Sequence, residues 1–216
     1  IRLITSSTPG EFLGTATAMN QLGLSFGRPC MSLSCLNVGL PAMEQSLAAL
    51  VEVNSFTDNP AGGRAVGALL LELLAIDGLV AQTVPSARYA DHLVFQSEGE
   101  TSRRPIALLG HLDTVFPPGK FEGYRTEGER RRGPGVLDMK GGLVVLAFAL
   151  KAIARAGGLG RIAPLRVVVV ADEEVGSPEG RPLIERVIAG CARCLVLESG
   201  RANDAIVTQR KGTGAV

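Results

Sequence analysis

A histidine and an aspartate stand two residues apart in segment 110–119, directly after an apolar run at residues 105–109. The run predicts a short buried strand, and Pro-Pro-Gly at 117–119 predicts that it goes no further. Because side chains two apart point the same way, His111 and Asp113 should lie together at the carboxyl edge of a sheet. A metal-bound imidazole commonly has a carboxylate on its other nitrogen. Alone the signal is weak, because most such triplets are surface polar residues.

Further carboxylates follow other apolar runs, at Asp138, Glu173, Glu174 and Glu198. Each has an ordinary explanation, since acids are common at solvated strand ends and the glutamate pair could cap a following helix. Together with Asp113, however, they would repel one another without a cation to offset their charge. One imidazole with several carboxylates suits zinc, manganese or cobalt. If one of two adjacent glutamates ligates metal, its neighbour can accept a proton.

Other chemistries find little support in the sequence. It contains neither a phosphate-binding glycine loop ending in Lys-Ser/Thr nor a Gly-x-Ser-x-Gly nucleophile motif. Cys191 and Cys194 could form a zinc or redox pair, alone or with Cys30 and Cys35. Buried reduced thiols are the simpler interpretation and favour a reducing, cytoplasmic location.

Composition excludes several classes of protein. With 216 residues, 46% of them hydrophobic and 20% charged, the chain can bury a substantial core. A net charge of +1 argues against a nucleic-acid partner or an anionic membrane partner. No apolar stretch is long enough to span a bilayer. The basic run 130–132 follows acidic residues between turn glycines, which predicts a solvated hairpin tip.

Regular patterning begins at Met43. Residues 1–42 carry three charges and no sustained period, so we expect a leader of uncertain origin there. Residues 43–208 should form the catalytic domain. The expected helices cover 43–53, 61–76, 141–153 and 179–189, and the expected strands cover 79–84, 93–96, 106–109, 165–171, 194–198 and 205–210, with a hairpin over 123–132. This alternation predicts a three-layer α/β/α fold with a largely parallel sheet.

Four motifs in this order resemble the M20 zinc metallopeptidases, closest to the glutamate carboxypeptidase (carboxypeptidase G2-like) branch. They are Gly-His-Leu-Asp-Thr-Val at 110–115, Gly-Pro-Gly through Asp-Met-Lys-Gly-Gly at 133–142, Asp-Glu-Glu-Val-Gly-Ser at 172–177 and Leu-Glu at 197–198. The resemblance covers about residues 43–216. The family also contains N-acyl amino acid deacylases of the acetylornithine deacetylase, desuccinylase and aminoacylase types, so deacylation stays open beside release of a C-terminal residue such as glutamate.

The resemblance implies a role for each site residue. His111 and Glu198 would bind one zinc ion, Asp138 would bridge two, and Glu174 would bind the second. Asp113 would orient His111. Glu173 would be the general base that deprotonates a zinc-held water for attack on the amide of a small peptide or N-acyl amino acid. The family commonly has a cis peptide after the bridging aspartate, here Asp138-Met139. Cobalt or manganese could replace zinc.

The resemblance also implies parts that this sequence lacks. The family's last zinc ligand is a late histidine beyond an inserted domain that often dimerises. The chain has two histidines, of which His92 suits an ordinary strand start. Residues 209–216 resemble the crossing into the inserted domain. We therefore expect an N-terminal fragment of a homodimeric enzyme, inactive or nearly so by itself. A non-catalytic metal-binding scaffold is the remaining alternative.

Overall fold

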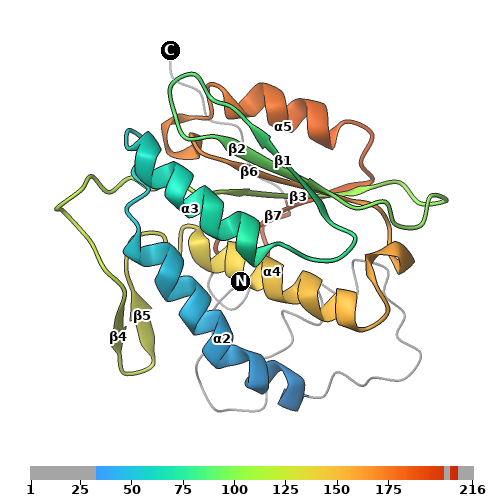
Figure 1. The fold of residues 1–216 in the computed structure, drawn as a ribbon, viewed down its shortest axis with the longest axis horizontal. Helices are drawn as coiled ribbons and strands as arrows, with labels where there is room; N and C mark the ends of the chain where they lie inside the picture. Colours follow the sequence, from blue (N-terminus) through green and yellow to red (C-terminus); the bar gives the residue numbers. More distant parts are fainter. Residues whose placement is uncertain (1–32, 202–204, 209–216) are drawn as a thin grey trace.

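The computed structural model describes residues 33–201 and 205–208, with side chains from residue 39 onward. A five-stranded sheet lies between two layers of helices (Figure 1). Its strands are β1 (Val80–Val84), β2 (His92–Gln96), β6 (Leu165–Val170), β3 (Ile106–His111) and β7 (Arg193–Val196), in that spatial order. The α-helices are α2 (Leu33–Glu52), α3 (Pro60–Leu73), α4 (Lys140–Arg155) and α5 (Gly180–Ile188).

Four of the five strands run in the same direction. β3 pairs in parallel with both β6 and β7. β2 is antiparallel to β6 and to β1, which makes β2 the reversed strand of this sheet. The predicted largely parallel sheet is therefore confirmed. Its parallel part brings the carboxyl ends of β3, β6 and β7 to one edge.

Alternating side chains of the strands serve two cores. Leu93, Phe95 and Val167 belong to a large core that also contains the apolar faces of α2, α3 and α4. Val94 and Val168 face a smaller core against Leu183 of α5. The Val-rich strand β6 is thus covered on both faces, as its continuous apolar run predicts. Helices on both faces give the expected three-layer α/β/α arrangement (Figure 1).

Two boundaries differ from expectation. Helix α2 begins at Leu33 and continues through Pro41, so the helix crosses Met43 rather than starting there. The strand expected at 205–210 is wrong for residues 205–208, which have no regular structure. The described residues 205–208 make no ladder with the sheet, and an apolar pattern alone forms no strand without a paired neighbour. Residues 209–216 lie outside the described part.

The cysteine prediction is half right. Cys191 and Cys194 are both free thiols, but Cys194 is exposed and Cys191 only partly buried. They flank the start of β7, which is the edge strand of the described sheet, so less of the protein covers them. Cys30 and the side chain of Cys35 lie outside the described part of the chain, so the four-cysteine site stays a prediction.

The basic run forms the expected hairpin. β4 (Arg125–Glu127) pairs with β5 (Arg130–Arg132) away from the main sheet. Its middle arginine is not simply solvated, because Arg131 forms an ion pair with Glu44 of α2. Arg132 pairs with Glu127 at 3.3 Å. Among the described residues, no helix combines the length and apolar character needed to cross a membrane.

Candidate metal centre

His111 is the last residue of β3 and is almost fully buried. β6 flanks this end of the strand, with Val170 in register with the histidine. The backbone N–H of His111 donates to the sulfur of Met139 at 3.1 Å. The strand extends two residues beyond the predicted end at Leu109, so the sheet itself fixes the position of the imidazole.

Asp113 holds the inner side of this imidazole. His111 Nδ1 lies 3.0 Å from the Asp113 carbonyl oxygen and 3.3 Å from its carboxylate Oδ1. The carboxylate also accepts the backbone N–H groups of Glu173 at 3.2 Å and Glu174 at 3.1 Å. Burial by itself would raise the pKa of Asp113, but its hydrogen bond and charge interaction with His111 outweigh that and lower it. Asp113 therefore stays ionised and links the β3 end to the glutamate pair.

The outer nitrogen of His111 faces carboxylates from three other segments. Nε2 lies 3.0 Å from Asp138 Oδ1, 3.4 Å from Glu198 Oε1 and 3.8 Å from Glu173 Oε2. One potential ligand atom each from His111, Asp138 and Glu198 fall within 4.8 Å of one another. One imidazole nitrogen and two carboxylate oxygens are a donor set that zinc accepts in tetrahedral sites. These residues therefore fit a zinc ion held between them.

Two loops deliver the carboxylates Asp138 and Glu198. Asp138 lies in the turn before α4, and its peptide bond to Met139 is cis, as the resemblance implies. Glu198 follows β7, where Leu197 N–H still donates to Leu109 O at 2.9 Å. A Cβ at Gly142 would come within 2.2 Å of the Leu197 carbonyl oxygen. Only glycine at this position of α4 lets the Glu198 segment approach so closely.

The glutamate pair lies in a short 3-10 helix, Glu173–Val175, after β6. The glutamate pair does not cap the following helix α5. Asp172 does so instead: its Oδ2 accepts the N–H groups of Glu179 at 2.7 Å and Gly180 at 2.9 Å at the start of α5. Glu173 extends toward the imidazole. Glu174 is held through its backbone and does not belong to the three-residue cluster.

Charge crowding shifts the pKa values of the cluster. Burial would lower the pKa of His111, but hydrogen bonds with Asp113, Asp138 and Glu198 raise it to about 12 in the absence of metal. The hydrogen bond from His111 lowers the pKa of Asp138. Burial, with neighbouring carboxylates, raises the pKa of Glu173 and raises that of Glu174 to about 7. The site thus holds excess negative charge that a divalent cation would balance.

Several residues that support the centre have no counterpart in the sequence-based predictions. Thr57 donates from Oγ1 to Asp113 Oδ2 at 2.8 Å. Lys140 is fully buried, and its ammonium donates to the carbonyls of Leu50 at 2.9 Å and Val53 at 3.0 Å near the end of α2. Burial lowers the pKa of Lys140 to about 7. The one sequence signal for either residue is that Lys140 belongs to the Asp-Met-Lys-Gly-Gly motif.

His92 is the second histidine of the sequence, and it is not a ligand of this cluster. It begins β2, as predicted for an ordinary strand start, and is buried. Its Nδ1 accepts the N–H of Ala171 at 3.1 Å. This bond holds the chain just before Asp172 and so steadies the glutamate pair.

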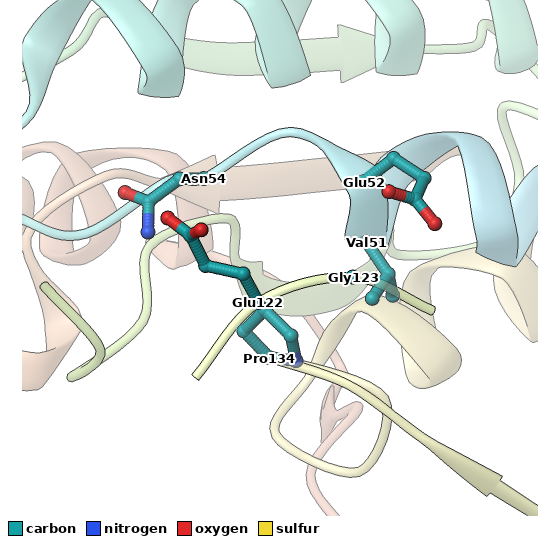
Figure 2. Close-up of a pocket in the computed structure, with 6 residues that line it drawn as sticks. All are labelled: Val51, Glu52, Asn54, Glu122, Gly123 and Pro134. Atoms are coloured by element: carbon teal, nitrogen blue, oxygen red, sulfur yellow. The ribbon is translucent and has the colours of Figure 1, made fainter. Parts of the chain in front are cut away.

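A cavity beside the end of α2 is not part of this centre. Figure 2 shows its lining by Val51, Glu52, Asn54, Glu122, Gly123 and Pro134. Its two carboxylates already accept backbone N–H groups: Glu52 from Tyr124 at 2.9 Å and Glu122 from Gly119 at 2.6 Å. These carboxylates therefore serve to hold the loops that surround the cavity.

Comparison with known proteins identifies the same region. Residues 107–210 match the model of the peptidase family M20/M25/M40. Carboxypeptidase G2 of Pseudomonas sp. is 31% identical over 149 residues, which cover 67% of this chain and 35% of that protein. The chain thus spans about a third of the length of the curated relative it matches.

Solved structures share the fold. Human carnosine dipeptidase 1 superimposes with a TM-score of 0.64 at 16% identity, over 76% of this chain and 39% of its own. An aminopeptidase from Bacillus cereus gives 0.61 at 18% identity, over 74% and 43%. An M20 family metallo-carboxypeptidase from Sulfolobus solfataricus gives 0.58 at 16% identity, over 73% and 37%. At these identities the likeness establishes the α/β fold.

Proposed function

We propose that this chain, whose residues 107–210 match the model of the peptidase family M20/M25/M40, belongs to that family and supplies the metal-binding part of a hydrolase that cleaves amide bonds. The proposed reaction releases a C-terminal amino acid, with glutamate as the first to test, from a peptide or N-acyl amino acid. The name of the Pseudomonas relative, a carboxypeptidase, supports this choice over deacylation.

One observation carries the proposal: carboxylates from two other segments converge on the buried imidazole of His111. Asp138 and Glu198 approach Nε2 at 3.0 and 3.4 Å while Asp113 occupies the opposite nitrogen. A histidine with a carboxylate behind it and carboxylates in front is the arrangement of a carboxylate–histidine–zinc site. An imidazole serving only the core would have no reason to gather so much negative charge.

Zinc at this position would polarise a carbonyl group and make a water molecule more acidic. The chain's own groups do the rest. Asp113 accepts a hydrogen bond from the Nδ1–H group of His111, which leaves Nε2 free to ligate. Glu173, at the rim of the cluster and half exposed, takes the proton of the attacking water and passes it to the leaving amine. The raised pKa of Glu173 suits this exchange, because a general base is most effective when its pKa lies near the operating pH.

We propose that a second zinc ion would bind between Asp138 and Glu174, more weakly than the first. The first ion would have three ligands from this chain, His111, Asp138 and Glu198. The second would have only carboxylates, since His92 does not belong to the cluster. We therefore expect one tight and one weak zinc ion per 216-residue chain. Hydrolysis by this chain alone should be slow or undetectable, because one of its two metal ions would be poorly held.

The test is metal binding by the purified 216-residue chain. Equilibrium dialysis against zinc with metal analysis should give one tightly bound ion per chain and a second at higher concentration. His111→Ala should lose the tight ion, and Glu122→Gln, in the separate cavity, serves as the matched control that keeps it. Tight binding that survives His111→Ala would refute the proposed centre.

Substrate class needs a second assay. A panel of acylated amino acids and dipeptides, tested with zinc, cobalt and manganese, measures hydrolysis directly. Preference for a C-terminal glutamate supports the carboxypeptidase proposal, and preference for short N-acyl groups would replace it with a deacylase. Rapid hydrolysis by the isolated chain would contradict the expected low activity.

A further inference from the structure

The connector between α2 and α3 lies against the metal centre. Residues 53–59 have the sequence Val-Asn-Ser-Phe-Thr-Asp-Asn and join α2 to α3. Backbone bonds tie it to the segment after β3: Thr114 N–H donates to Ser55 O at 2.9 Å, and Thr57 N–H donates to Thr114 O at 3.2 Å. These two hydrogen bonds therefore fix the position of the connector beside Asp113.

Two buried hydroxyl groups of the connector reach the segment after β3, with different partners. Ser55 Oγ donates to the backbone carbonyl of Leu112 at 2.7 Å. Thr57 Oγ1 donates to the carboxylate Oδ2 of Asp113 at 2.8 Å. Both side chains are nearly inaccessible to solvent. The serine thus secures the backbone, whereas the threonine acts directly on the group that orients the histidine.

The carboxylate of Asp113 has a divided task. Oδ1 faces His111 Nδ1 and the N–H of Glu173, and Oδ2 faces the N–H of Glu174 and Thr57. The Thr57 bond is the shortest of these four, and within the described part of the chain Thr57 is the one side-chain donor to Oδ2. Without it, Oδ2 would keep the N–H of Glu174 as its remaining partner, and the carboxylate would lose the shortest of the hydrogen bonds that oppose its rotation about χ2.

We propose that Thr57 is a positioning residue of the metal centre: its hydroxyl fixes the rotation of the Asp113 carboxylate, which fixes the imidazole of His111 for metal binding. Thr57 lies outside residues 107–210, the part that matches the family model. The connector therefore contributes to the site although it carries no metal ligand. This inference rests on the proposed metal centre.

The physical basis is the cost of ordering the ligands. A metal-binding imidazole whose second nitrogen is held in place loses less freedom on binding, and the partner carboxylate makes the ligating nitrogen more basic. Changes to such outer partners typically weaken metal binding about 10- to 100-fold. We expect the same range for loss of the Thr57 hydroxyl, one bond further from the metal, with the lower end applying.

The experiment compares Thr57→Val, which keeps the shape and removes the hydroxyl, with Thr57→Ser, which keeps the hydroxyl. Ser55→Ala is the matched control, because it deletes a buried connector hydroxyl that does not touch Asp113. Each full 216-residue chain is titrated with zinc against a chromophoric chelator. Urea unfolding of the metal-free chains measures stability, and the visible spectrum of bound cobalt reports ligand geometry.

Thr57→Val should bind zinc about 10-fold more weakly and alter the cobalt spectrum, and Thr57→Ser should restore both. Ser55→Ala should lower stability while keeping zinc affinity and spectrum. Equal zinc affinity for Thr57→Val and wild type, or an equal loss in Ser55→Ala, would overturn the inference. If Thr57→Val does not fold, Thr57→Ala against Thr57→Ser decides by the same comparison. A wild-type chain that binds zinc no better than His111→Ala would instead refute the metal centre itself.

Discussion

The two halves of the centre are built differently. His111 and Asp113 are only 1% and 2% exposed, and the sheet, Thr57 and two backbone N–H groups hold them. The carboxylates that face them are open, with Asp138 57% and Glu198 39% exposed, and they approach from loops. The buried half is fixed by the fold before any metal arrives.

This difference assigns different energetic roles to the halves. In the buried half, each group lost leaves a partner without water or counter-charge, so a substitution there should reduce both stability and metal affinity. In the open half, solvent replaces a lost group, and like charges already repel. A substitution there should reduce metal affinity while leaving the fold intact.

His111→Ala should have the largest effect. It removes the one imidazole of the cluster, so zinc affinity should fall beyond the about 10- to 100-fold that outer-partner changes cost. It also leaves the charge of Asp113 buried without its histidine, which should lower the free energy of unfolding by about 3 kcal/mol. Chelator competition and urea unfolding measure the two effects. A variant as stable as wild type would show that the buried half is not pre-organised by this pair.

Zinc affinity should rise steeply with pH. In the metal-free chain the pKa of His111 is about 12, so zinc must displace a proton from Nε2. Affinity should therefore increase by about 10-fold per pH unit between pH 6 and 8, with a proton released on binding. Titrations in buffers of different ionisation enthalpy measure that proton. Affinity that does not change over this range would mean that the imidazole is already neutral.

The same linkage sets the stability of the metal-free chain. The folded pKa of His111 lies above its ordinary value of 6.5. Its contribution to stability is therefore fully present below pH 6.5 and is lost progressively as the pH rises toward about 12. Urea unfolding at pH 6 and pH 9 should show this loss for wild type and not for His111→Ala.

Glu198→Gln tests the open half. Zinc affinity should fall by about 10-fold or more, since a charged ligand is lost. The free energy of unfolding of the metal-free chain should stay within about 0.5 kcal/mol of wild type, as for other solvent-accessible substitutions. Chelator competition and urea unfolding on the same sample separate the two. A large loss of stability would place Glu198 with the buried half.

Glu173→Gln should have the smallest effect on binding. A general base is not a ligand, so zinc affinity and stability should remain at wild-type values. Under conditions where hydrolysis is measurable, the rate should fall by about 10²- to 10⁴-fold. Dialysis and a substrate assay check the two sides. Loss of zinc in this variant would exchange the proposed roles of Glu173 and Glu174.

Local patterns were enough to predict most of the framework. Apolar runs gave β3 and β6, and glycine and proline placed the turns around the hairpin β4–β5. The strand expected at 205–210 is absent from the described residues 205–208, because a β-strand needs a neighbouring strand to pair with and local sequence does not supply one. The exposure of Cys194 likewise depends on which strand lies at the sheet edge.

The sequence by itself determined which residues could bind metal, because a histidine and carboxylates at strand ends are visible in local patterns. Only the tertiary structure decided what holds them. Thr57 meets Asp113 from 56 residues away, and Lys140 reaches Leu50 from 90 residues away. Threonine in a turn and lysine at a helix start are common everywhere, so no local signal marks them. Their function arises from burial and from the partner each meets, and both are properties of the folded chain.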